Sequence, residues 1–123
     1  MAALPMDNEA WIIEEGDRVI RKKAAGGFDG LTTWERLLYT LWVVDYGMRN
    51  AGDLGTATDV LTDWQAVAFG AADLLGLPTT REAFALGPDE LQGRYFDLFN
   101  SVCEEVQSAE PGAAPGSGGE EAG

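Results

Sequence analysis

The sequence predicts an all-α fold: a single-domain bundle of four to five amphipathic helices followed by a disordered C-terminal tail. Three observations support this prediction. Apolar residues recur with a helical period along most of the chain, Gly and Pro residues interrupt the periodic segments, and strand patterns are weak. Residues 1–109 are assigned to the domain, because a chain of this length supports one compact core and not two.

The first helix is expected over residues 8–24. One face collects apolar or small residues at a helical spacing, namely Ile12, Ile13, Gly16, Val19 and Ile20. The sequence AGGFDG, with three glycines in six residues, ends this helix. Basic residues near its end favour the negative pole of the helix dipole, and they are Arg18, Arg21, Lys22 and Lys23.

The second helix begins with a capping box, in which Thr32 caps the helix and the Glu35 side chain reaches back. Its apolar face consists of Trp34, Leu37, Leu38, Leu41, Val44 and Met48. Asp45 projects from the middle of this face, and Arg49 follows one helical turn later, where it can pair with Asp45. We interpret the two as a structural ion pair at the helix end; a catalytic role for Asp45 is the alternative.

A third helix is expected from about residue 58 to residue 75, ending at Gly76. Its apolar arc contains Val60, Leu61, Trp64, Val67, Ala71, Leu74 and Leu75. At 100° per residue, three acids fall together on the opposite side: Asp59, Asp63 and Asp73.

Two more helices complete the bundle. A short helix over residues 80–86 has Thr79 or Thr80 as its cap. The last helix starts at Pro88 and runs to about Gln107. Its core stripe contains Leu91, Tyr95, Leu98, Phe99, Val102 and Val106, and its outer side carries Glu90, Asp97 and Glu104.

The C-terminal segment 110–123, EPGAAPGSGGEEAG, contains only Pro, Gly, Ala, Ser and Glu. Such a segment lacks the apolar bulk that would offset the entropy lost on ordering. We therefore expect a disordered tail that the fold does not need.

The chain is strongly acidic, with a net charge of −13 and a balance of −12 over residues 24–123. A field of this sign repels nucleic acid and anionic membranes and favours basic partners. We expect no direct binding to nucleic acid or to membranes. The apolar runs are too short to span a bilayer and no signal peptide is evident, so a cytoplasmic location is expected.

The residue inventory argues against most catalytic sites. The chain has no histidine, which removes Ser–His, Cys–His and His–metal arrangements. Neither a phosphate-binding glycine loop nor a calcium loop is present in the sequence. Cys103 is the lone cysteine and is expected in the core. We expect no enzymatic activity, no cofactor and no metal.

The run LTTWERLLYTLWVVDYGMRNAG resembles the domain family typified by DNA mimic protein 19. Leu31, Thr32, Glu35 and Arg36 match the family's helix start, and Met48, Arg49, Asn50, Ala51 and Gly52 occupy the signature at the helix end. The later AVAFGAADLLGLPTTREAFA is similar to the family's Ala-rich helix and its short successor, so the resemblance covers residues 28–86. Asn50 and Gly52 also suit a sharp left-handed exit from the helix.

The resemblance implies a small, acidic, all-helical protein, and one family member places carboxylates where DNA has phosphates. We hypothesise that the acidic surface binds a basic partner, such as a transcription factor or nucleoid protein. The acids assigned to this surface are Asp59, Asp63, Asp73, Glu90, Asp97 and Glu104. Two neighbouring helices must interleave these acids, because side chains seven residues apart on one helix are separated by about 10.5 Å.

Two alternatives remain at the level of the sequence. In the first, the acidity only keeps an accessory domain soluble. In the second, the protein is an enzyme in which Asp45 and Arg49 line a pocket at the turn formed by residues 50–52.

Overall fold

The computed structural model describes residues 7–110, which form six α-helices and one 3₁₀ helix and contain no strand. The predicted all-α single domain is confirmed. The elements are α1 (Asn8–Gly26), η1 (Phe28–Gly30), α2 (Thr33–Ala51), α3 (Gly55–Val60), α4 (Trp64–Leu75), α5 (Pro78–Ala85) and α6 (Pro88–Ser108). Apart from Glu110, the predicted tail lies outside the described residues.

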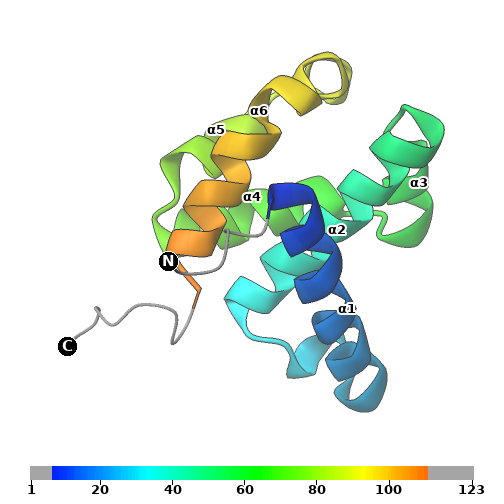
Figure 1. Cartoon of the computed structure of the whole chain (residues 1–123), viewed down its shortest axis with the longest axis vertical. Helices are drawn as coiled ribbons and strands as arrows, with labels where there is room; N and C mark the ends of the chain where they lie inside the picture. The colour runs from blue at the N-terminus through cyan, green and yellow to red at the C-terminus, as the bar shows by residue number, and fades with distance from the viewer. Residues whose placement is uncertain (1–6, 111–123) are drawn as a thin grey trace.

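Helix α2 is the centre of the domain and packs against α1, α3 and α4 (Figure 1). Helix α5 packs against both α4 and α6. The side chains of Leu37, Leu38 and Val44 are fully buried, and burial extends to most sides of α2. A helix that is apolar on most of its circumference is expected in a core, and the long apolar run of α2 provides this.

Helix α1 packs closely on α2 at Gly16. A Cβ atom on Gly16 would lie 2.2 Å from Cδ1 of Trp42, so only glycine fits at this contact. Ile12 and Val19 are buried beside it, whereas Ile13 is 52% exposed. The prediction that Ile13 belongs to the core face was therefore wrong. The buried face of α1 is narrower than its apolar pattern suggested.

The predicted third helix over residues 58–75 is instead two helices, α3 and α4. The chain leaves α3 at Leu61, whose φ of −144° and ψ of 89° are not helical, and resumes a helix at Trp64. The predicted core residues Val60 and Leu74 are 54% and 79% exposed. Trp64 and Ala71 of the predicted arc are buried, and Ala68 and Ala72, which the prediction omitted, complete the buried face of α4.

The start of α5 also differs from the prediction. The helix begins at Pro78, and neither Thr79 nor Thr80 caps it through its side chain. The backbone N–H groups of Thr79 and Thr80 instead donate to the Glu105 carboxylate of α6, at 3.0 and 2.6 Å. This acid satisfies the free donors of the helix start and complements the positive end of its dipole.

The predicted ends of α2 are confirmed. Thr32 and Glu35 form the capping box, and Gly52 ends the helix in the left-handed conformation with φ of 76°. Asn50 lies inside the last turn, where its side-chain amide donates to the Tyr46 carbonyl at 2.8 Å.

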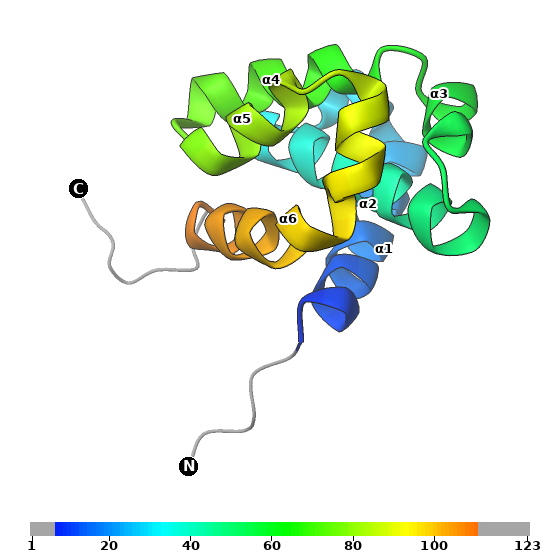
Figure 2. The same ribbon diagram turned by 90° about the horizontal axis from the view of Figure 1, so that it is seen from above.

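Helix α6 changes direction part-way along its length (Figure 2). Its predicted core stripe is buried, except that Leu98 is only half-buried. No helix between residues 7 and 110 combines the length and the apolar character that crossing a membrane requires.

Candidate functional site

The predicted Asp45–Arg49 pair is present at the end of α2. Asp45 is 4% exposed, and the Arg49 Nε–H group donates to both of its carboxylate oxygens at 3.0 Å. The Tyr95 hydroxyl of α6 donates to the same carboxylate at 2.7 Å, which the sequence did not reveal. A buried carboxylate is tolerated here because a cation and a hydroxyl donor both satisfy it.

Arg49 connects three helices. Its guanidinium lies 3.6 Å from the Glu9 carboxylate of α1 and stacks over the rings of Phe96 and Phe99 of α6, at 5.2 and 4.8 Å from their centroids. Burial lowers the pKa of Arg49, but the hydrogen bonds and charge of Asp45 outweigh burial and raise it. The guanidinium therefore stays charged, and its contacts hold α1, α2 and α6 together.

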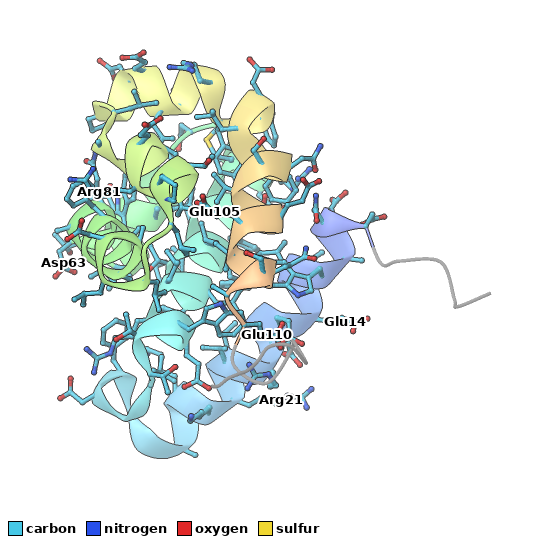
Figure 3. All side chains as sticks on the ribbon, turned by 90° about the vertical axis from the view of Figure 1, so that its left-hand side faces the viewer. Glu14, Arg21, Asp63, Arg81, Glu105 and Glu110 are labelled. Atoms are coloured by element: carbon cyan, nitrogen blue, oxygen red, sulfur yellow. The ribbon has the colours of Figure 1, made fainter. Side chains whose placement is uncertain are left out.

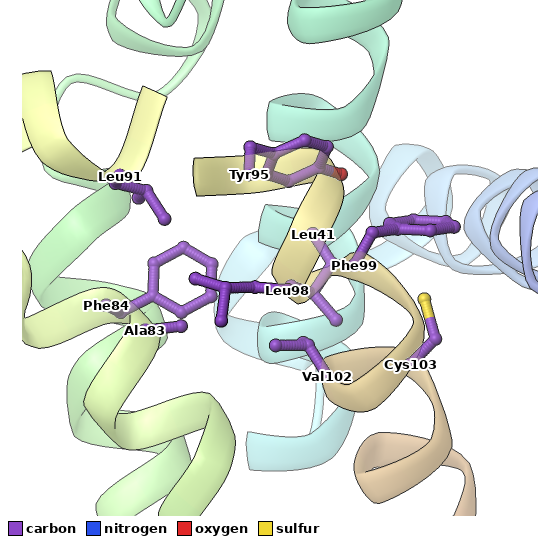
Figure 4. A pocket seen from close by; sticks show the side chains of 9 residues that line it. All are labelled: Leu41, Ala83, Phe84, Leu91, Tyr95, Leu98, Phe99, Val102 and Cys103. Carbon is purple, nitrogen blue, oxygen red and sulfur yellow. The ribbon is translucent and has the colours of Figure 1, made fainter. Parts of the chain in front are cut away.

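A small cavity lies close to this cluster, between α5, α6 and α2 (Figure 4). Its volume is about 20 Å³, which accommodates about one water molecule. Leu41, Phe84 and Phe99 are among its lining residues, and neither Asp45 nor Arg49 lines it. The cavity therefore offers no space for a substrate beside the Asp45 carboxylate.

The tyrosine and cysteine near the cavity are both held in their protonated forms. Burial, together with the charge of Asp45, raises the pKa of the Tyr95 hydroxyl. Burial and Asp45 also raise the pKa of the Cys103 thiol to about 12. Cys103 is buried as expected and carries little of the thiolate that nucleophilic chemistry requires.

A second buried carboxylate, Glu35, lies at the start of α2 and is 7% exposed. The Lys22 ammonium of α1 is 2.7 Å from it, and the guanidinium of Arg18 is 3.6 Å away. Burial acts to raise the pKa of Glu35, but Lys22 and the Thr32 N–H group outweigh this and lower it. Lys22 and Arg18 thus neutralise an acid on another helix, whereas the sequence suggested only a dipole role.

Glu105 is the third carboxylate with a clear structural role. It lies where α6 faces α5 and holds the N–H groups at the start of that helix (Figure 3). Burial acts to raise the pKa of Glu105, and the hydrogen bonds from Thr80 and Thr79 outweigh it and lower the pKa.

The six acids of the predicted partner-binding surface are all exposed. Asp59 lies on α3, Asp63 precedes α4 and points away from the body of the molecule (Figure 3), and Asp73 lies near the end of α4. Glu90, Asp97 and Glu104 lie along α6. Two of the six form ion pairs: Asp73 with Arg81 at 2.8 Å and Glu90 with Arg94 at 3.2 Å.

The structure does not place these acids in one straight row. The break between α3 and α4 separates Asp59 from Asp73, and the bend in α6 separates the first turn, with Glu90, from the last turns, with Glu104. The interpretation of Asp59, Asp63 and Asp73 as one face of a single helix was wrong, because the chain is not helical over residues 61–63.

Charge is unevenly distributed between two regions of the described chain. Residues 7–52, which we call the N-terminal region, contain eight acids and six bases, a balance of −2. Residues 53–110, the C-terminal region, contain eleven acids and two bases, a balance of −9. Within the described residues, Asp59, Asp63, Asp97 and Glu104 make no ion pair.

Comparisons with protein-family models, with curated proteins and with solved structures give no match to this chain. The resemblance to the family typified by DNA mimic protein 19 therefore stays a prediction. Asn50 and Gly52, which the resemblance assigned to that family's signature, lie at the end of α2, where Asn50 donates to the Tyr46 carbonyl and Gly52 ends the helix.

Proposed function

We propose that the protein is an interaction domain whose C-terminal region binds a basic DNA-binding protein and presents carboxylates where DNA would present phosphates. The observation that supports this most is the charge balance of −9 over residues 53–110. The only two bases of this region, Arg81 and Arg94, already pair with Asp73 and Glu90. A basic partner therefore meets no free positive charge there.

A surplus of negative charge on a surface mainly affects the association rate and the choice of partner. A surface of one sign raises the association rate of an oppositely charged partner and repels DNA itself. Exposed acids without an intramolecular base are the ones that can exchange water for the partner's Lys and Arg side chains. Asp59, Asp63, Asp97 and Glu104 are the members of the predicted surface in this position.

An enzyme built on Asp45 and Arg49 receives less support. The Asp45 carboxylate is buried, already accepts hydrogen bonds from Arg49 and Tyr95, and does not line the adjacent cavity. Acid–base catalysis requires a carboxylate that a substrate can reach.

The first experiment identifies the partner and tests competition with DNA. The immobilised chain is incubated with native lysate at low and high salt, and the retained proteins are identified by mass spectrometry. We expect a basic protein whose affinity falls as ionic strength rises, because the contact consists of screened charges. A short DNA duplex should displace the acidic chain from that protein; simultaneous binding of both would contradict mimicry.

The second experiment separates a specific surface from overall charge. The double variant Asp97→Lys with Glu104→Lys changes the C-terminal region, and its control, Glu14→Lys with Asp29→Lys, makes the same charge change at exposed acids of the N-terminal region. We expect the first to weaken binding by about tenfold or more and the control by much less. Equal losses would mean that only total charge matters, and no loss in either would mean that these acids only solubilise the domain.

A further inference from the structure

An open groove of about 850 Å³ lies between the connection that joins α3 to α4 and the connection that joins α5 to α6. Phe69, Ala66, Ala85 and Pro88 contribute accessible apolar surface to it above the buried rings of Trp64 and Phe84, and Thr58, Thr62 and Asp63 contribute polar atoms. The groove therefore combines an apolar floor with a polar rim, which is the usual anatomy of a protein-binding patch.

Hydrogen bonds across the groove fix its two walls relative to each other. The Gln65 side-chain amide of α4 donates to the carbonyls of Phe84 and Leu86, at 3.1 and 2.6 Å. The Trp64 indole N–H donates to the Thr58 hydroxyl at 3.1 Å, which ties α4 to α3. A groove that is already formed loses less conformational entropy when a partner binds.

The charge on the groove lining is negative. Asp63 is the only charged residue that lines it, and residues 50–80 contain four acids and no base. Asp59 and Asp89 directly follow the lining residues Thr58 and Pro88 in the sequence. Arg81 lies 5.0 Å from the Phe69 ring, but it does not line the groove and it pairs with Asp73.

We propose that the groove is the docking site for a short basic amphipathic helix of the partner protein, an inference that rests on the proposed function. Its apolar side lies on Phe69, Ala85 and Pro88, and its Lys and Arg side chains face Asp63 and Asp59. A helix fits better than an extended strand, because the described chain has no sheet edge to pair with. A docked segment must satisfy its own backbone hydrogen bonds, which a helix does.

The probe is a synthetic peptide of about four helical turns, with Leu at i, i+3, i+4 and i+7 and Lys on the other side. A scrambled peptide of the same composition and charge is its control. Binding to the full chain is measured by fluorescence anisotropy. We expect the amphipathic peptide to bind at least about tenfold more tightly than the scrambled one.

Three substitutions without a change of charge locate the site. Ala66→Trp and Ala85→Trp fill the groove from its two walls at exposed positions, and Ala25→Trp is the control on an exposed part of α1. Each groove variant should lower the affinity of the amphipathic peptide, and of the partner, by about tenfold, whereas Ala25→Trp should leave both unchanged. Melting curves verify that the variants fold. Because Ala66 and Ala85 lie on different walls of the groove, their two substitutions are independent tests.

Several outcomes would overturn the groove proposal. These are equal binding of the two peptides, equal effects of all three Trp substitutions, or no binding of either peptide. If the partner still responds to Asp97→Lys with Glu104→Lys in these cases, the acidic-surface function stands while the groove proposal falls. Sedimentation that changes only in the groove variants, with no peptide binding, would assign the groove to a second copy of the chain.

Discussion

The N-terminal and C-terminal regions use carboxylates in opposite ways. In residues 7–52, five of eight acids form ion pairs, and two of these, Asp45 and Glu35, are buried. In residues 53–110, only two of eleven acids form ion pairs, and both of those pairs are exposed. Asp45 and Glu35 of the first region hold helices together, whereas most acids of the second, with Glu105 as an exception, are exposed and form no ion pair.

This difference shows what a high acidic content does not reveal by itself. A buried carboxylate costs free energy unless a cation or hydrogen-bond donors compensate for it, so its partners are fixed by the fold. An exposed carboxylate in water costs little and contributes little to stability. Stability should therefore depend on the few buried acids, and partner binding on the many exposed ones.

The largest expected effect is at the buried pair. Asp45→Asn removes the buried charge that Arg49 and Tyr95 compensate and should lower the free energy of unfolding by about 1–3 kcal/mol. The same change at Asp97, which is exposed, should alter it by less than about 0.5 kcal/mol. Urea unfolding of the two variants measures both values.

Partner binding should not depend on the Asp45 carboxylate, because that carboxylate is buried. We expect Asp45→Asn to retain partner binding. Unchanged stability of Asp45→Asn together with complete loss of function would contradict the structural role and favour an active-site role instead.

A second comparison uses one glycine from each region. Gly16→Ala places a methyl group 2.2 Å from the Trp42 side chain, so Trp42 or the two helices must shift and the free energy of unfolding should fall by about 1–2 kcal/mol. Gly70 in α4 has no neighbour within 4 Å of a Cβ atom, so Gly70→Ala should raise it by about 0.5–1 kcal/mol. Thermal melting distinguishes the two; equal stabilisation would show that the α1–α2 contact adapts freely.

The third prediction concerns acid. The pKa values of Glu35 and Glu105 lie below their ordinary value of 4.5 in the folded chain. Their contributions to stability are therefore present above this pH and are lost as the pH falls through the lower folded-state values. Denaturant unfolding between neutral pH and about pH 3 should show a shallower loss for Glu35→Gln and Glu105→Gln than for the unchanged chain.

The two glutamates test the two regions separately. Protonation of the exposed surplus acids relieves repulsion and acts in the opposite direction, so the difference between each variant and the unchanged chain is the informative quantity. Identical pH profiles for Glu105→Gln and the unchanged chain would contradict the role of Glu105 at the start of α5.

The smallest expected effect is that of salt on stability. Added NaCl screens the repulsion among the exposed acids of residues 53–110 more than it screens the buried pairs of residues 7–52. We expect the melting temperature to rise with salt by a few degrees, which corresponds to about 0.5 kcal/mol. A fall in the melting temperature would show that the attractive pairs of the N-terminal region determine the response.

Local patterns predicted much of this fold. The capping box of Thr32 and Glu35 fixed the start of α2, and Gly52 and Gly76 were correctly recognised as helix ends. The pairing of Asp45 with Arg49 followed from their spacing, since residues four apart on a helix are neighbours. These features depend on a few consecutive residues and can therefore be predicted from the sequence alone.

The sequence by itself determined the all-α class, the apolar central helix and the acidic charge, because helical period, capping and charge are local or additive properties. Only the tertiary structure decided the break at residues 61–63, the burial of Ala68 and Ala72 in place of Leu74, and the contacts of Tyr95 with Asp45 and of Glu105 with α5. Each of these depends on which helices meet, and the two contacts join residues at least 25 positions apart. Hydrophobicity ranks Leu above Ala, but close packing of two helices selects the smaller side chain.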